Sequence, residues 1–367
     1  MRCLILLLAS TLAVASAAAD DVWIPGGESV HKRVNARRGK TSLSKLASSM
    51  KPGTWAKLET KIPERLWSAP QPSKGLHIGT WSDDAHWDSR TGQFLFFGVR
   101  QARKFVAYSE VTNAWRVIEF EGAKDAPELK QRFGHQYSNN SLDAERSRFY
   151  TSRYQYDLLT DEWNQLPPTK LAQQTMVYEF FSAMDGLLCL AKKPTGALSV
   201  YREDQQAWAS LGVLPVHGYH SLARHNPFRQ EVLFAGGNDS QAVVILSKDG
   251  KATRMKDFPI APLTVRHSIV TVDPLSGRYL FLVPPERKFY EFNSETNTFR
   301  LIDDCTTTPW PFGRYEAPVV AYIPEYSVTM WADKTVWLYK HSAMPASKTQ
   351  PSTIGKGGDK KRLHELR

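Results

Sequence analysis

His, Arg, Tyr and Glu side chains recur at matching places along this sequence, and together they could hold or transform a small polar molecule. Tyrosine offers a flat face to such a molecule, and arginine binds carboxylates through two parallel hydrogen bonds. Histidine and glutamate can exchange protons with a bound molecule. The candidate ligand-binding residues are Arg132, His135, Tyr137, Tyr219, His220, Arg266, His267, Arg314, Tyr315 and Glu316.

The spacing of these residues relative to turns suggests that they meet. Four segments present His, Arg, Tyr or Glu six to eight residues before an Asp or Asn turn. The first such segment carries residues 80–84, and the third offers Gln174, Tyr178 and Glu179 in poorer register. Arranged around one axis, the side chains would form a polar, aromatic and partly cationic cup. In the alternative interpretation, Arg and His cap strand ends and satisfy loop carbonyl groups.

Several histidines raise the question of a metal site. His217, His220 and His225 lie close together, and His135 and His267 could converge with them. Catalytic zinc needs three protein ligands and an open position. His225 lies at the far end of its strand, so we expect it to point to the opposite face. We therefore predict no metal and no cofactor.

The elements that position these residues follow a repeat. Each unit contains an aromatic or apolar residue, six mostly polar residues, and then Trp or a substitute. The five instances span residues 108–115, 156–163, 201–208, 246–253 and 292–299, so their starts are 48, 45, 45 and 46 positions apart. This pattern predicts a hairpin in which one strand ends at the aromatic residue, a polar turn follows, and the Trp begins the outer strand.

A second hairpin precedes each of these in the chain. Its turn residue is Asp88, Asp143, Asn226 or Asp273, and each turn leads into an apolar strand. Four strands per repeat follow. Such a unit cannot bury both of its faces alone, so we expect the units to stack around an axis.

The sixth unit ends at residues 336–339 without an outer strand. Residues 51–58 have the character of that missing strand. We therefore predict an all-β fold, a six-bladed β-propeller of four-stranded blades, in which an N-terminal strand closes the last blade. Closure removes an exposed sheet edge.

The units resemble kelch repeats, through the Tyr-x6-Trp spacing, the aromatic strand before it, and Gly236-Gly237 in the fourth unit. The resemblance, to the kelch and galactose-oxidase central-domain-like superfamily, covers roughly residues 51–340. The double glycine occurs in one unit only. The Gly-His and Trp-Asp signature of WD40 repeats is missing. The resemblance implies a propeller that binds its ligand at one face.

The N-terminus has the pattern of a secretory signal peptide. Arg2 precedes an apolar run from Cys3 to Val14, and small residues follow. We expect residues 1–19 to be removed and the protein to be secreted or periplasmic. No later segment is long and apolar enough to span a membrane, so we also expect a soluble protein.

The net charge of +10 lies mostly in two tails. Residues 20–50 carry six Lys and Arg against three Asp and Glu, and residues 341–367 carry six against two. The body, residues 51–340, has 34 against 32. We predict that both tails are basic and disordered, with attachment to an anionic surface as an alternative role. Because the body is almost neutral, we expect no nucleic-acid partner.

The function predicted from these features is an exported binding module that recognises a carbohydrate or protein ligand at the channel face. One alternative is a sugar-active enzyme of the epimerase or polysaccharide lyase type. Another is a protein-interaction scaffold with an inert channel. We expect a monomer.

Overall fold

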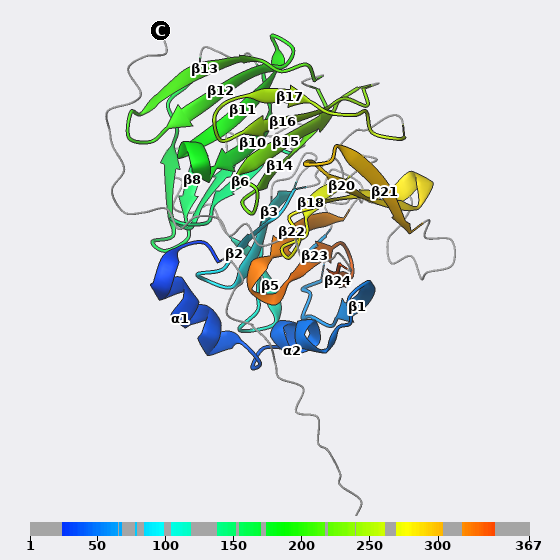
Figure 1. Cartoon of the computed structure of the whole chain (residues 1–367). Coiled ribbons are helices and arrows are strands. Elements are labelled where there is room, and N and C mark those ends of the chain that lie inside the picture. The colour runs from blue at the N-terminus through cyan, green and yellow to red at the C-terminus, as the bar shows by residue number, and fades with distance from the viewer. Residues whose placement is uncertain are drawn as a thin grey trace, which may run out of the picture.

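The computed structural model describes residues 24–64, 66–67, 78, 84–98, 104–118, 138–151, 154–169, 174–216, 219–238, 240–260, 269–303 and 318–341. In this part of the chain, six four-stranded antiparallel sheets form a ring, with two α-helices beside it (Figure 1). The predicted six-bladed β-propeller is confirmed.

The strands follow one another blade by blade. Blade 1 contains β2 (His86–Asp88), β3 (Gln93–Gly98), β4 (Lys104–Ser109) and β5 (Ala114–Ile118). Blade 2 contains β6 (Asn140–Asp143), β7 (Arg148–Thr151), β8 (Tyr154–Asp157) and β9 (Glu162–Gln165). Blade 3 contains β10 (Gln174–Phe181), β11 (Gly186–Lys193), β12 (Ala197–Arg202) and β13 (Ala207–Val213).

The second half of the ring has the same order. Blade 4 contains β14 (Ser221–Asn226), β15 (Glu231–Gly236), β16 (Val243–Ser247) and β17 (Ala252–Arg254). Blade 5 contains β18 (Ile269–Val272), β19 (Tyr279–Val283), β20 (Lys288–Asn293) and β21 (Thr298–Asp303). Blade 6 contains β22 (Val319–Ile323), β23 (Val328–Ala332), β24 (Val336–Lys340) and β1 (Thr54–Leu58).

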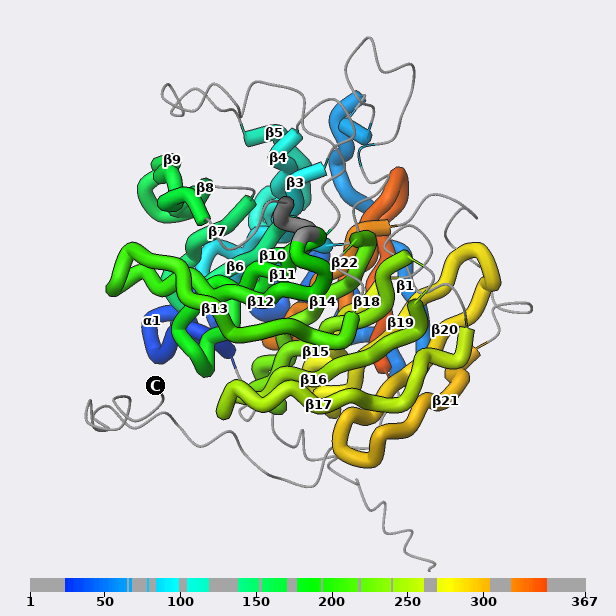
Figure 2. The backbone as a smooth tube through the Cα atoms, turned by 90° about the horizontal axis from the view of Figure 1, so that it is seen from above, coloured from blue at the N-terminus to red at the C-terminus, as the bar shows by residue number. Residues whose placement is uncertain are grey.

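The first strand of each blade is the innermost. These strands contact one another around the ring, β2 with β6, β6 with β10, and so on to β22, which returns to β2. In Figure 2, β10, β14, β18 and β22 lie toward the middle of the molecule, and β9, β13, β17 and β21 lie at its outside. Residues on the inner strands therefore surround the axis of the ring.

The repeated hairpin forms as predicted. Tyr108 lies opposite Trp115, with ring centroids 5.3 Å apart, and the equivalent pairs in blades 2, 3 and 5 are also in register. Blade 4 differs, because Thr253 pairs with Ile245 rather than with Leu246. The prediction of this outer hairpin is thus confirmed, with a shift of one position in blade 4.

The tryptophans that begin outer strands also contact the neighbouring blade. The ring of Trp163 in blade 2 lies 5.7 Å from that of Phe105 in blade 1. Aromatic pairs of this kind contribute about 1 kcal/mol beyond their buried area. The repeat therefore stabilises the packing of blades as well as the hairpin within each blade.

The closing strand is confirmed. β1 pairs antiparallel with β24, with Thr54 opposite Lys340 and Leu58 opposite Val336. Trp55 lies opposite Tyr339, 4.7 Å away between ring centroids, and 5.7 Å from Phe289 of blade 5. The last blade is thus completed from the N-terminal side of the chain and packs on its neighbour through the same residue.

The prediction of disorder over residues 20–50 is wrong for residues 27–49. They form α1 (Gly27–Arg37) and α2 (Ser42–Ser49), which we call the N-terminal clasp. The helices bury a few apolar side chains at helical spacing, namely Val30, Val34, Leu43 and Ala47. Leu43 and Ala47 pack in the apolar cluster shared by blades 1 and 6, and Val30 and Val34 pack with Ile24. These contacts supply the burial that composition alone did not predict.

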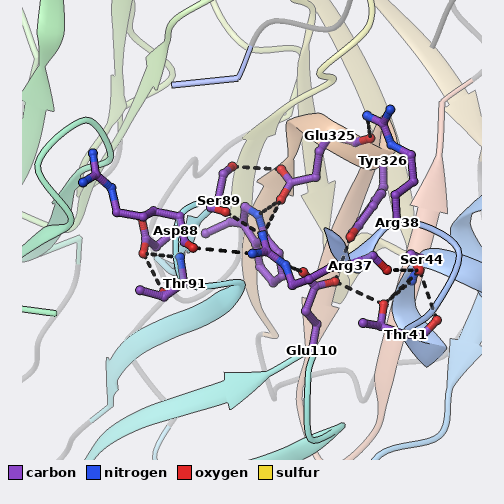
Figure 3. Close-up of polar contacts among 12 residues, drawn as sticks. Arg37, Arg38, Thr41, Ser44, Asp88, Ser89, Thr91, Glu110, Glu325 and Tyr326 are labelled. Atoms are coloured by element: carbon purple, nitrogen blue, oxygen red, sulfur yellow. Dashed lines mark hydrogen bonds and ion pairs between the residues drawn. The ribbon is translucent and has the colours of Figure 1, made fainter. Parts of the chain in front are cut away.

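A buried arginine attaches the clasp to both blades (Figure 3). The guanidinium group of Arg37 forms an ion pair with Glu110 of blade 1 and lies 3.7 Å from Glu325 of blade 6. Glu110 also accepts hydrogen bonds from Tyr326, at 2.9 Å, and from Thr41, at 3.2 Å. One of the basic residues of this segment, Arg37, is therefore a buried ion-pair partner.

The predicted signal peptide and C-terminal tail, residues 1–19 and 342–367, lie outside the described residues. Within the described part of the chain, no helix has the length and apolar character needed to cross a bilayer.

Candidate functional site

A polar pocket lies on the axis of the ring. Its walls come from the inner strands of five blades and the residues next to them, and they enclose about 330 Å³ free of atoms, including space open to solvent. The lining residues are Ala85, His86, Trp87, Leu142, Ala144, Glu179, Arg224, His225, Ala321 and Tyr322. We call it the channel pocket.

Arg224 extends across the channel. From β14 in blade 4 it forms an ion pair with Asp84 and donates to the carbonyl of Ala85, at 3.2 Å. Both partners immediately precede β2 of blade 1, which is opposite blade 4 in a ring of six. Its Nε also donates to the carbonyl of Val270 in β18, at 3.2 Å. Arg224 is 1% exposed, so one side chain links three blades inside the core.

Glu179 contributes a second buried carboxylate, from β10. Its Oε1 accepts a hydrogen bond of 2.8 Å from the backbone N–H of His225. Its Oε2 is buried and has no hydrogen-bond partner among the described residues. Since a buried carboxylate oxygen is costly to leave without a donor, Glu179 is the wall residue best placed to accept a hydrogen bond from a ligand.

Two histidines complete the polar wall. His86 Nε2 lies 3.5 Å from Asp84 Oδ2, and the ring of His86 packs edge-on against Phe149, with centroids 6.0 Å apart. His225 Nε2 lies 3.5 Å from the hydroxyl of Ser182. Both imidazoles are buried, so their protonation depends on the surrounding charges.

Burial shifts the pKa values of these groups toward their neutral forms. It raises the pKa of Asp84 to about 7, although the charge of Arg224 acts in the opposite direction. It likewise raises the pKa of Glu179 to about 7, with a further increase from Asp84. Burial lowers the pKa of His86 to about 4 and that of His225 to about 3. At neutral pH the histidines are therefore uncharged, and the two carboxyl groups are close to their titration midpoints.

This arrangement can accept hydrogen bonds and can exchange protons. A carboxyl group with a pKa near 7 is suited to general acid–base chemistry at neutral pH. Among the described residues, no group of three His, Cys, Asp or Glu is placed to hold a metal ion.

Of the ten residues predicted from the sequence, the structure describes two, Tyr219 and His220. They precede β14 and stack on each other, with ring centroids 3.9 Å apart. Lys192 Nζ lies 4.0 Å above the ring of Tyr219, and His220 Nδ1 contacts Asn238 Oδ1. His220 has a φ of +65°, which is uncommon for a residue other than glycine.

These two residues do not line the channel pocket. The other eight predicted residues lie outside the described part of the chain, namely Arg132, His135, Tyr137, Arg266, His267, Arg314, Tyr315 and Glu316. The proposed cup at the starts of the inner strands therefore stays a prediction.

The sequence interpretation did not select the residues that form the pocket. Asp84 and Glu179 were noted in their segments but were left out of the predicted set. His225, which we expected to point to the face opposite that of His220, lines the channel pocket. The available signal was an ionisable residue inside a buried strand, such as Arg224 within Leu222–Asn226, just before the turn rather than at the strand start.

Comparison with known proteins supports the fold and gives no family. No family model matches the chain, and no curated protein matches it. A solved structure of an auxiliary nutrient binding protein from Bacteroides ovatus has a TM-score of 0.53 at 10% identity, covering 77% of this chain and 75% of that one. A protein of unknown function from Bacteroides thetaiotaomicron has a TM-score of 0.49 at 11% identity, covering 68% and 67%.

Proposed function

We propose that this protein is an exported binding module that holds a small polar ligand, of the carbohydrate class, in the channel pocket. The observation that carries the proposal is the convergence of buried polar groups from several blades on one pocket. Trp87 and Tyr322 add aromatic surface to its wall, which suits the apolar faces of a sugar ring. A structural neighbour called a nutrient binding protein is consistent with this role, although at 10% identity the likeness concerns the fold.

Export rests on the signal-peptide pattern of residues 1–19, and assignment to the kelch class rests on the spacing of the repeat. Expression of the full chain in a secreting host tests export. We expect the mature N-terminus to begin near residue 18 or 20, as read by mass spectrometry. A protein that keeps residues 1–19 and stays in the cytoplasm would contradict export.

Ligand binding is tested by calorimetry of the purified protein against monosaccharides and short oligosaccharides. We expect His86→Ala to weaken binding about ten-fold, because it removes a polar group from the pocket wall. His31→Ala, on α1, is the matched control and should bind like the unaltered protein. If both variants bind equally well, the ligand lies elsewhere, and Tyr219→Ala then tests the predicted cup.

A second candidate function, a sugar-active enzyme of the epimerase or lyase type, is favoured by Glu179, whose raised pKa of about 7 and unpaired Oε2 suit proton transfer. An enzyme should lose turnover but keep binding in Glu179→Gln. A binding module should turn over none of the sugars that it binds. A scaffold with an inert channel should bind its protein partner equally well with and without His86→Ala.

A further inference from the structure

The channel pocket is poor in available positive charge. Among the described residues that line the pocket, Arg224 is the only Lys or Arg. Its guanidinium group already forms an ion pair with Asp84 and donates hydrogen bonds to the carbonyls of Ala85 and Val270. The imidazoles of His86 and His225 are held neutral by burial, which keeps their pKa values at about 4 and about 3. An anionic ligand would therefore find no free cation in this part of the wall.

The same wall offers an acceptor without a donor. Glu179 is 3% exposed and lines the pocket, and its Oε2 has no hydrogen-bond partner among the described residues. Its other oxygen is held by the backbone N–H of His225, so the carboxyl group is fixed in place. When Asp84 and Glu179 are both ionised, the set of Asp84, Arg224 and Glu179 carries a net negative charge.

The pocket wall also contains aromatic side chains. Trp87 and Tyr322 line the same pocket, and indole and phenol rings attract cations through their faces. The indole N–H of Trp87 is bonded to Glu325, at 2.8 Å, and Tyr322 packs against Phe228, with ring centroids 5.8 Å apart. Both rings are thus held in position before a ligand arrives.

We propose that the channel pocket selects a small ligand carrying an ammonium group, with Glu179 as its counter-ion. This inference rests on the proposed function and specifies it, because a hydroxyl-bearing amine such as an amino sugar satisfies both. The ammonium group donates to Glu179 Oε2, and the aromatic wall covers the adjacent carbon atoms.

The test compares four probes by calorimetry at pH 7, namely glucosamine, glucose, glucuronate and choline. The first three share one ring and differ in charge, while choline has the cation without the ring. We expect glucosamine to bind about ten-fold tighter than glucose, since a hydrogen bond to a charged group is stronger than one between neutral groups. We expect glucuronate to bind most weakly.

Glu179→Gln should abolish the preference for glucosamine over glucose. Glu203→Gln is the matched control and should keep the preference, because Glu203 lies in a turn of the same blade as Glu179 and pairs with Arg148 of blade 2. Thermal unfolding establishes that both variants are folded. The comparison of probes on the unaltered protein needs no variant, so the proposal is testable even if Glu179→Gln fails to fold.

Proton release gives an independent measurement. Burial raises the pKa of Glu179 to about 7. The titratable and charged groups that interact with its carboxyl group are Asp84, His86, Arg224 and Tyr322. An ammonium ligand stabilises the carboxylate, so binding at pH 6.5 should release protons, seen as a dependence of the binding enthalpy on the ionisation enthalpy of the buffer. Glu179→Gln should remove this dependence.

The outcomes separate this inference from the proposed function. Tightest binding of glucuronate, or an unchanged preference in Glu179→Gln, would overturn the charge assignment and leave carbohydrate binding in place. Binding of choline through Glu179 without binding of any sugar would support the ammonium site and reject the carbohydrate class. If no probe binds and a solved structure has only water at Glu179 Oε2, both are rejected.

Discussion

Arg224 and Asp84 depend on each other, because neither charge could be buried alone at low cost. Removing one partner of a buried ion pair costs about 3–5 kcal/mol, since the other is left without compensation. In this protein the pair also links opposite blades, so its loss affects the ring as well as the pocket.

Replacement of Arg224 by Met should therefore lower the free energy of unfolding by about 3–5 kcal/mol at pH 8, where Asp84 is ionised. Urea denaturation measures the change. Arg254→Met is the matched control, because Arg254 forms an exposed ion pair with Asp257, and it should cost less than about 1 kcal/mol. The double variant Asp84→Asn with Arg224→Met should recover part of the loss. If Arg224→Met and Arg254→Met lower the free energy of unfolding equally, this interpretation is contradicted.

The pH dependence of stability should carry the sign of a raised carboxyl pKa. Glu179 has a pKa of about 7 in the folded protein and an ordinary value of 4.5. The native state binds more protons between these values, so this contribution to stability is complete below pH 4.5 and is lost as the pH rises through 7. We expect Glu179→Gln to gain stability relative to the unaltered protein between pH 5 and pH 8, measured by thermal unfolding.

Glu291 provides a contrast of opposite sign. Burial alone would raise its pKa, but hydrogen bonds from His341 and Arg300 and the charge of Arg278 hold the pKa at about 2. Its contribution is present above pH 4.5 and lost as the pH falls toward 2. Glu291→Gln should therefore be less stable than the unaltered protein at pH 7, with a difference that shrinks in acid. If both variants respond to pH alike, these assignments are wrong.

The pocket could be predicted only in part from the sequence. Asp84 and Glu179 were visible as acidic residues near inner strands, but their meeting with Arg224 depends on which blades face each other across the ring. His225 lies near the end of β14, away from the strand start that follows Tyr219 and His220, and it lines the pocket. Which end of the inner strands carries a pocket is not visible in the sequence.

The N-terminal clasp is the element that joins the two blades at the seam. Arg37 is 9% exposed, and the two carboxyl groups beside it, Glu110 and Glu325, are 1% and 4% exposed. Burial raises the pKa of both carboxyl groups, to about 7 for Glu325, while Arg37 lowers that of Glu110. The guanidinium group therefore reduces the cost of keeping two acids in one contact.

We expect Arg37→Ala to lower the unfolding free energy by about 3 kcal/mol at pH 8, because it leaves buried carboxylates without a cation. Chemical denaturation gives the value. Arg33→Ala, exposed on the same helix, should change it by less than about 0.5 kcal/mol. Addition of Glu110→Gln to Arg37→Ala should restore part of the stability. A loss in Arg33→Ala as large as in Arg37→Ala would contradict this role of the ion pair.

At the level of elements, periodicity predicted the blades and composition failed for the clasp. The hairpins were visible because Tyr108 and Trp115 pair locally across one turn. The helices were not, because each has only a short stripe of apolar residues, and Leu43 and Ala47 become buried against blades that lie far away in sequence. Local sequence patterns therefore predicted the hairpins, which are stabilised by contacts close in sequence, and did not predict the helices of the clasp.

The whole ring is closed by one strand that joins the two ends of the fold. β1 supplies the outer edge of blade 6, and Trp55 contacts Trp331 within that blade, 5.6 Å between ring centroids, as well as Phe289 of blade 5. Without β1, the backbone of β24 would be an unpaired edge available to other chains. The clasp lies next to this strand in sequence, so the contributions of strand and clasp must be separated.

Two truncations separate them. A chain that begins at residue 51 keeps β1 and loses the clasp, and it should unfold cooperatively at a lower temperature. A chain that begins at residue 63 loses β1 as well, and it should lose cooperative unfolding and self-associate, because an open edge strand remains and the aromatic contacts of Trp55 are gone. Calorimetry and size-exclusion chromatography measure both properties. A monomeric protein with unchanged melting after removal of residues 1–62 would mean that closure by β1 does not stabilise the propeller.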